Sequence, residues 1–270
     1  MPDNQPATLG SVERAFGIID HLSRHPNSRL ADLTDALDIP KSTIFTHLQT
    51  LKACGFVIKE ADRYRLSLRF LHHGGLLRHQ LPIYRHARDP AKELANNTGE
   101  LVNIGVEENG LGVVIEMFKG GTTAVDLDPI GKYSYLHQAA YGKAMLANFS
   151  KTKVKSVIDR HGLPELTEET ITDRDGLFEE LDDIQKQGYA MERDEGDIGI
   201  GCIGTAILGP EGHTIGGISV TLPSSKFEHN SFIDQTIQYT LDCANIIELQ
   251  LQHGQEPAHS AFLQVETRGG

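Results

Sequence analysis

Hydrophobic residues recur at helical spacing in three segments near the start of the chain, 12–22, 30–37 and 44–51. This spacing predicts three amphipathic helices. Pro40 suits the first turn of the third helix, and Gly55 is placed to end it. Two short segments, 56–59 and 63–66, then predict a pair of strands. Three helices followed by a two-stranded hairpin form the pattern of a winged helix-turn-helix unit.

The rest of the chain mixes helical and strand periodicity. Helices are predicted at 68–81, 84–97, 137–149, 151–161, 174–187 and 231–251. Strands are predicted at 101–106, 111–118, 122–127, 201–208 and 213–222. Strands that arrive as hairpins, with helices between and after them, favour an antiparallel sheet covered by helices. We therefore predict an α/β protein of the α+β type, with a disordered tail after His253.

The length allows two domains or one large domain, and the composition indicates a globular protein without a membrane helix. A chain of 270 residues can hold two domains, and no apolar run approaches the roughly 20 residues that a membrane helix needs. The polar first ten residues lack the apolar core of a signal peptide. Three cysteines without a CxxC pair, Cys54, Cys202 and Cys243, suit reduced thiols in the cytoplasm better than disulfides.

The formal charge of −12 is unevenly distributed along the chain. Residues 1–80 contain 10 Lys and Arg against 8 Asp and Glu, a balance of +2, whereas residues 81–270 contain 15 against 29, a balance of −14. A neutral-to-basic start joined to an acidic body is typical of an anion-binding module attached to a sensor or enzyme domain. The alternative is chance variation in surface charge.

The outward side of the third predicted helix can form hydrogen bonds but contains no acid. In a winged helix-turn-helix unit this helix enters the major groove, where hydroxyls and a helix N-terminus can hold phosphate oxygens. Two arginines flank the predicted wing turn and could reach the backbone or the minor groove. The candidate DNA contacts are Lys41, Ser42, Thr43, Phe45, Thr46, His47, Thr50, Arg63 and Arg65. The alternative is a solvated face on an ordinary helical bundle.

Sequence motifs for enzymes and metals lack the context that they need. Residues 199–204 spell GxGxxG, but a segment of strand length follows, whereas a dinucleotide site needs a helix there. Cys202 with His137 as its base could form a nucleophilic pair, although most buried cysteines are inert. A histidine cluster, His72, His73, His79 and His86, favours a solvated or packed linker over a metal site. We predict no catalytic residue, no cofactor and no metal.

Three segments of the acidic body suggest a ligand pocket. Residues 188–209 mix acids with glycines, Ser219 and Thr221 lie on one strand face, and residues 135–146 put small residues at a helix start. A small carboxylate could accept hydrogen bonds from that helix terminus and from the two hydroxyls. Taken singly, each segment is also explained by packing between sheet and helix.

Taken together, these segments resemble the IclR family of transcriptional regulators. The resemblance runs from about Ser11 to Leu251 and rests on motifs in the family's order and spacing. These are SVERAFGIIDHL, PKSTIFTHLQTLKACGFV and RYRLSLR in the first part, and NNTGELVNIGV, LHQAAYGKAML, GYAMERDEGDIGIGCIGTAIL and GGISVTLP in the second. The resemblance implies a winged helix-turn-helix DNA-binding domain over 1–68, a linker helix over 69–83, a GAF-like effector-binding domain over 84–253 and a tail over 254–270.

The resemblance also implies a dimer, often paired into a tetramer, that binds a partly palindromic operator. Such a protein would control catabolic genes in response to a small acid or a sugar-derived metabolite. Effector contacts carried over by motif position are Ala140, Tyr141, Glu192, Ile200, Cys202, Gly204, Ser219 and Thr221. Tyr141 stands where the family usually has a small residue, and Glu192 stands where aspartate is common. The ligand class of the family is therefore not carried over to this chain. Thr46-His47 replaces a pattern that usually includes arginine, so the operator sequence of the family is not carried over either.

Two further hypotheses stay open at the level of sequence. The rival class is a small-molecule sensor or enzyme whose N-terminal bundle mediates protein contacts only. In addition, the acidic body, the few lysines and the absence of tryptophan suggest a protein that works in concentrated salt, as in a halophilic archaeon. At about 1 M salt the screening length falls to roughly 3 Å, so DNA binding there would depend more on shape and groove contacts than on charge.

Overall fold

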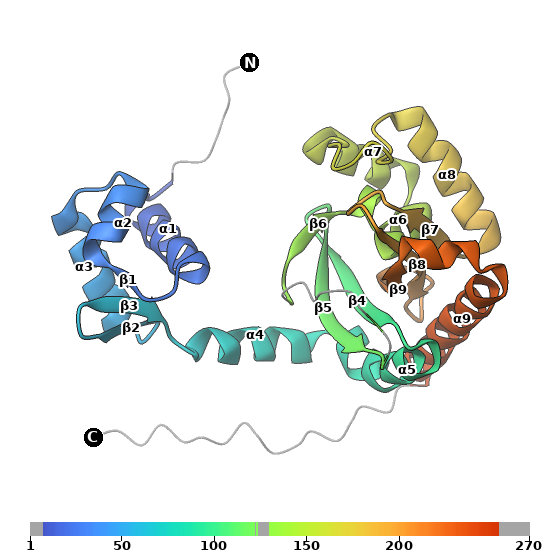
Figure 1. The fold of residues 1–270 in the computed structure, drawn as a ribbon, viewed down its shortest axis with the longest axis horizontal. Coiled ribbons are helices and arrows are strands. Elements are labelled where there is room, and N and C mark those ends of the chain that lie inside the picture. Colours follow the sequence, from blue (N-terminus) through green and yellow to red (C-terminus); the bar gives the residue numbers. More distant parts are fainter. Residues whose placement is uncertain (1–7, 122, 124–129, 254–270) are drawn as a thin grey trace. The chain divides into compact units, whose positions relative to one another are not determined.

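The chain folds into two compact units, Met1–Arg78 and His79–Gly270 (Figure 1). The computed structural model describes residues 8–121, 123 and 130–253. Each unit has a hydrophobic core of its own, one in the first unit and one on each face of the sheet in the second. No helix among these described residues is long and apolar enough to span a bilayer.

The first unit consists of three helices and a small antiparallel sheet. Its elements are α1 (Gly10–Arg24), β1 (Ser28–Arg29), α2 (Leu30–Leu37), α3 (Lys41–Ala53), β2 (Val57–Glu60) and β3 (Arg63–Leu66). The sheet order is β1-β3-β2. The predicted helices and hairpin are confirmed. The sequence analysis missed β1, because two residues are too short to show a periodicity.

The helical spacing of the apolar residues gives this unit one shared core. Each core side chain is at most 2% exposed, and they are Ile18, Leu22, Leu33, Ile44, Leu48, Val57 and Tyr64. Gly55 follows α3 with φ 78°, where the N–H groups of Gly55 and Phe56 donate to the carbonyls of Lys52 and Leu51, both at 2.9 Å. This is the Schellman ending that glycine favours. Pro40 is the N-cap of α3 and so precedes its first turn by one residue.

The linker predicted between the two parts forms one exposed helix, α4 (Arg69–Gln80), which has no buried residue. Its histidines contact aromatic rings of their own unit. The ring of His73 stacks on Phe56 with centroids 5.5 Å apart, and the ring of His79 meets Tyr84 edge-on at 5.2 Å.

The second unit is a six-stranded antiparallel sheet with helices on both faces (Figure 1). Its strands are β4 (Leu101–Glu108), β5 (Leu111–Lys119), β6 (Tyr133–Tyr135), β7 (Ala190–Arg193), β8 (Ile200–Leu208) and β9 (Thr214–Pro223), in the order β6-β5-β4-β9-β8-β7. Its helices are α5 (Pro82–Thr98), α6 (Ala140–Ala147), α7 (Lys151–His161), α8 (Arg174–Gln187) and α9 (Asn230–Gln252), with short 3-10 turns η1 (Leu136–Gln138) and η2 (Ser224–Glu228).

Three details of this unit differ from the sequence-based expectation. The helix predicted over 137–149 is divided into η1 and α6. The short edge strands β6 and β7 were not predicted. The strand predicted at 122–127 lies outside the described residues except for Thr123, which is not in a strand, and the predicted disordered tail also lies outside them.

The sheet separates two apolar layers because successive side chains of a strand point to opposite faces. Ile203 and Val220 belong to the layer with α5 and α9. On the other face, Tyr141 and Met145 of α6 belong to the layer with α7 and α8. Helix α6 therefore lies over the face that carries the candidate effector residues.

Candidate functional site

Helix α3 buries one side and exposes the other. Ile44 and Leu48 are fully buried. The exposed side chains are Lys41, Ser42, Phe45, Thr46, Gln49, Thr50, Lys52 and Ala53. No acid lies on this helix, and no side chain caps its N-terminus. An uncapped N-terminus leaves backbone N–H groups for an anion such as a DNA phosphate.

Hydrogen bonds within the unit occupy several of the polar groups on α3. Thr46 and Thr50 donate their hydroxyl hydrogens to the carbonyl oxygens four residues earlier, each at 3.0 Å. The ring nitrogens of His47 lie 2.8 Å from the Thr43 oxygen and 3.0 Å from the Ser11 oxygen. His47 and Thr43 are half-buried. His47 therefore ties α3 to the start of α1 and is not the outward-facing side chain that the sequence suggested.

The two arginines of the wing, which is the β2–β3 hairpin, also form hydrogen bonds inside the first unit. Arg65 holds the Glu60 carboxylate with Nε at 3.0 Å and Nη2 at 2.5 Å. Arg63 donates to the Asn27 carbonyl oxygen at 2.9 Å. The wing thus carries less free positive charge than its sequence suggests.

Strand register brings the candidate effector residues of β7, β8 and β9 into one row. Glu192 lies opposite Cys202, and Cys202 lies opposite Thr221. Gly204 pairs with Ser219, two residues away from Cys202 and Thr221 on the same strands. These positions alternate with core residues of the opposite face, so all of them face α6. Ile200 is two residues before Cys202 on β8, and its side chain is half-buried.

Hydrogen bonds link this row into a chain. The Cys202 thiol bonds the Glu192 carboxyl group, and its sulfur lies 3.2 Å from Thr221 Oγ1. Asn103 Nδ2 donates a hydrogen bond to Thr221 Oγ1 at 2.9 Å. Burial raises the pKa of Glu192 to about 7 and raises the pKa of the Cys202 thiol well above its ordinary value. The sequence analysis missed Asn103, whose signal was a lone amide inside an apolar strand.

A buried lysine lies beside this row. Lys143 of α6 is 0% exposed, and its Nζ donates to Glu195 Oε1 at 2.7 Å and to a Glu180 carboxylate oxygen on α8. Glu195 Oε2 is buried without a hydrogen-bond partner among the described residues. Burial raises the pKa of Glu195, although Lys143 opposes that shift. Lys143 was not among the effector residues predicted from the sequence.

Tyr141 fills the space over the middle of the sheet. A Cβ atom at Gly105 would lie 2.3 Å from its ring, and one at Gly112 would lie 2.6 Å from its hydroxyl oxygen. That oxygen lies 3.1 Å from Ser134 Oγ. A Cβ atom at Gly204 would lie 2.6 Å from the Tyr141 nitrogen. Glycines therefore allow both the large ring and the start of α6 at Ala140 to lie directly on the sheet.

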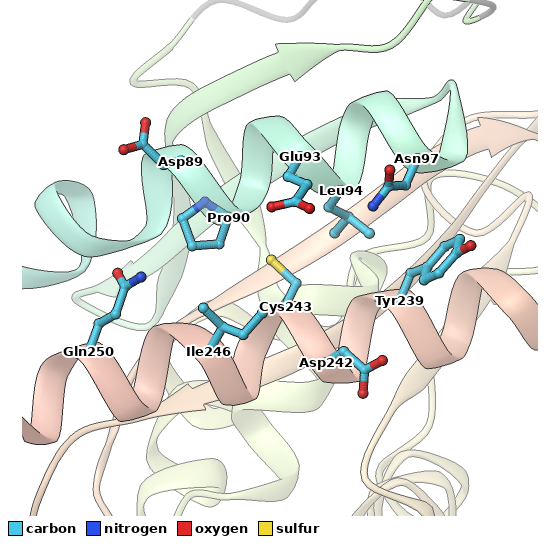
Figure 2. Close-up of a pocket in the computed structure, with 10 residues that line it drawn as sticks. All are labelled: Asp89, Pro90, Glu93, Leu94, Asn97, Tyr239, Asp242, Cys243, Ile246 and Gln250. Atoms are coloured by element: carbon cyan, nitrogen blue, oxygen red, sulfur yellow. The ribbon is translucent and has the colours of Figure 1, made fainter.

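Two cavities of the second unit lie away from this row. One of about 380 Å³ runs between α5 and α9, and Figure 2 shows its lining residues, Asp89, Pro90, Glu93, Leu94, Asn97, Tyr239, Asp242, Cys243, Ile246 and Gln250. Another, of about 260 Å³, lies beside the β4–β5 turn and α7. Neither is lined by a predicted effector residue. Burial raises the pKa of the Cys243 thiol to about 12, so this cysteine lacks the thiolate that a nucleophile requires.

The structure around the GxGxxG motif differs from that of a dinucleotide-binding site. The GxGxxG segment leads into β8 and not into a helix, so the dinucleotide fingerprint is absent there, as the sequence analysis inferred. Within the described part of the chain, no group of three or more His, Cys, Asp or Glu side chains could hold a metal ion.

A three-helix unit with a wing, followed by a helix-covered antiparallel sheet with a buried polar row, defines a two-domain transcription regulator. Residues 11–61 match the model of the IclR helix-turn-helix domain, and residues 76–249 match that of the bacterial transcriptional regulator IclR C-terminal domain. The chain belongs to the IclR family.

Individual relatives agree with this assignment. The chain is 30% identical over 254 residues to the probable HTH-type transcriptional regulator ArcR of Halobacterium salinarum, covering 93% of this chain and 97% of ArcR. It is 28% identical over 227 residues to the HTH-type transcriptional regulator KdgR of Escherichia coli, covering 83% and 86%. The crystal structure of Thermotoga maritima IclR matches with a TM-score of 0.79 at 25% identity, covering 91% of this chain and all of that one.

These matches confirm the predicted family and fold class. The chain is a DNA-binding regulator with an effector-binding C-terminal domain, and its family consists of transcription regulators and not of enzymes.

Proposed function

We propose that this protein controls catabolic genes from the cytoplasm by binding a partly palindromic operator as a dimer or a dimer of dimers. The observation that carries the proposal is the exposed, acid-free side of α3 with its uncapped N-terminus, in a unit that matches the IclR helix-turn-helix domain. Lys41 and Ser42 would hold phosphates at that N-terminus, whereas Phe45, Thr46 and Thr50 would face base edges.

The remaining DNA-contact candidates have supporting roles in this proposal. Thr43 and His47 would position α3, because they are half-buried and His47 bonds α1. Arg63 and Arg65 would approach the DNA backbone from the wing, with Arg65 weakened by its pairing to Glu60.

The effector would be a small acid or a sugar-derived metabolite bound beside the start of α6, on the sheet face that carries the buried polar row. The proposed contacts are Ala140, Tyr141, Glu192, Ile200, Cys202, Gly204, Ser219 and Thr221. The buried hydrogen-bonded row supports this, since buried donors and acceptors can read a polar ligand. Binding would change DNA affinity only if the ligand binds two arrangements of the protein unequally.

The DNA-binding proposal is tested with exposed residues, since their replacement leaves the core intact. Lys41→Ala together with Ser42→Ala is expected to weaken binding to a native promoter fragment by at least about tenfold, because the variant loses phosphate contacts and their counterion release. Fluorescence anisotropy measures the affinity, and far-UV circular dichroism checks the fold. Lys186→Ala, on the exposed surface of α8, is the matched control. Equal affinity of the double variant and the wild type would contradict the proposal.

The effector proposal is tested by a thermal-shift screen of catabolic acids and sugars against the full chain. A true effector is expected to raise the midpoint of thermal unfolding of the wild-type protein. It should raise the midpoint of Thr221→Val much less, because this variant keeps the side-chain volume but lacks the hydroxyl group. A ligand that stabilises both proteins equally would lie elsewhere.

We also propose that the protein works in concentrated salt, which the −14 balance of residues 81–270 supports. Its relative ArcR, from Halobacterium salinarum, is similar over almost its whole length.

A further inference from the structure

Helix α3 presents a large apolar side chain in the middle of its polar side. Phe45 is 45% exposed, and its neighbours on that side, Ser42, Thr46 and Gln49, are exposed as well. The core of the unit is already anchored on α3 by Ile44 and Leu48. In a helix that enters the major groove, an exposed phenyl ring gains free energy only where it meets another apolar group.

Internal hydrogen bonds make the neighbouring positions less polar than their sequence suggests. Each hydroxyl group has one hydrogen to donate, and those of Thr46 and Thr50 are donated to backbone oxygens of α3 at 3.0 Å. What these two side chains can still offer a base edge is a methyl group and oxygen lone pairs. The two ring nitrogens of His47 lie 2.8 Å and 3.0 Å from backbone oxygens of the same unit, so the ring is held within the unit. The centre of the exposed side is therefore suited to apolar contacts.

In the major groove, the standard base edges display hydrogen-bond donors and acceptors with one apolar exception, the C5-methyl group of thymine. We propose that Phe45, assisted by the methyl groups of Thr46 and Thr50, reads thymine methyl groups in the operator. This inference rests on the proposed DNA-binding function and adds the chemical group that is read. Lys41, Ser42 and Gln49 would then fix the position of α3 rather than supply the main discrimination.

The test removes single methyl groups from the DNA. The full-length protein first selects duplexes from a random-sequence library, and each thymine of an enriched duplex is then replaced by deoxyuridine, which pairs identically but lacks the methyl group. At one or two positions of each half-site, this change is expected to weaken binding about fourfold. That ratio corresponds to about 0.8 kcal/mol for each apolar group removed from water. Affinities are measured by fluorescence anisotropy.

The protein variants assign the effect to Phe45. Phe45→Ala is expected to bind the thymine and deoxyuridine duplexes equally, whereas Phe45→Leu, which keeps an apolar side chain, retains part of the difference and covers the case in which the alanine variant does not fold. Phe16→Ala removes another exposed phenyl ring, 60% exposed on α1, and is expected to keep the full fourfold ratio.

Two outcomes would overturn the inference while leaving DNA binding intact. One is wild-type protein that binds all deoxyuridine duplexes as tightly as the thymine duplex, and the other is a folded Phe45→Ala variant that keeps the full preference. If the library yields no enriched duplex, the proposed function itself fails and the inference falls with it.

Discussion

Glu192 and Lys143 show how burial changes the chemistry of single residues in the second unit. Glu192 is 4% exposed and Lys143 is 0% exposed. Charged groups at such positions need partners, because an unpaired buried charge is costly. Lys143 has two carboxylates, whereas Glu192 has a thiol and the Glu195 backbone N–H. The two residues therefore respond to pH and to substitution in different ways.

The Glu192→Gln variant is expected to have a flatter dependence of stability on pH. Burial raises the pKa of Glu192 from 4.5 to about 7, so between these values the folded state keeps a proton that the unfolded state has released. The free energy of unfolding therefore falls as pH rises from about 4.5 to about 7. The loss is on the order of 3 kcal/mol, and it is absent from the variant because a glutamine side chain cannot ionise.

Urea unfolding at pH 5 and pH 8 measures this effect. The wild type should lose more stability than Glu192→Gln between the two pH values. Glu195, whose pKa is also raised, should leave a residual slope in the variant. Identical slopes for the two proteins would show that Glu192 is ionised in the folded state at pH 5.

The Lys143→Met variant is expected to be destabilised by about 3–5 kcal/mol at pH 8, because it leaves the Glu195 carboxylate buried without its cation. At pH 5 the loss should be smaller, since Glu195 can then take up a proton. Chemical denaturation at both pH values measures the difference. Lys186→Met breaks the exposed pair with Asp183 and should leave stability nearly unchanged. A loss that is equally small for both variants would contradict the inferred role of the buried cluster.

At the scale of secondary structure elements, the proposed DNA contacts come from the wing and from α3. Helix α3 exposes polar and apolar side chains without any acid. On the wing, β2 supplies Glu60 and β3 supplies Arg65, and the two side chains form an ion pair. In the proposed complex, the ion pair between Glu60 and Arg65 would reduce the attraction between the wing and the DNA backbone, and groove contacts from α3 would supply more of the affinity.

The Glu60→Gln variant is therefore expected to bind DNA more tightly and with a steeper salt dependence. Releasing the Arg65 guanidinium adds about one phosphate contact for each wing, so the slope of log affinity against log salt should steepen by about one unit per wing. Anisotropy titrations from 0.1 to 0.5 M KCl measure both quantities. Asp183→Asn removes the same charge from the surface of α8 and should change neither. An unchanged slope in Glu60→Gln would mean that the wing does not approach the DNA.

The charge of the whole molecule is divided between its two units. The chain is −12 overall, but Met1–Arg78 holds 10 Lys and Arg against 8 Asp and Glu, a balance of +2, while His79–Gly270 carries the acidic excess. Repulsion between like charges within a unit lowers the stability of that unit, and salt screens this repulsion. The second unit should therefore respond to salt more strongly than the first.

Raising KCl from about 0.1 M to about 1 M shortens the screening length from roughly 10 Å to roughly 3 Å. The thermal midpoint of the second unit is expected to rise, whereas that of the first unit should change little. Differential scanning calorimetry of the full chain measures both transitions. A midpoint of the second unit that falls in molar salt would contradict the proposal that this protein works in concentrated salt.

Much of the fold could be predicted from sequence, because helical and strand periodicities are local. The helices over Gly10–Arg24 and Asn230–Gln252 and the hairpins β4–β5 and β8–β9 appear where the spacing placed them. The edge strands β1 and β6 have two and three residues, too few to show a period. The family motifs also located Cys202 and Thr221, and the strand register brings these two side chains together.

The sequence by itself determined the class of protein, the positions of most elements and the acid-free character of α3. Only the tertiary structure decided which polar side chains are free to contact DNA or a ligand. His47 bonds Ser11, which is 36 positions away, and Lys143 bonds Glu195, which is 52 positions away. The physical reason is that periodicity is a property of neighbouring residues, whereas burial and pairing depend on segments that meet only when the chain folds.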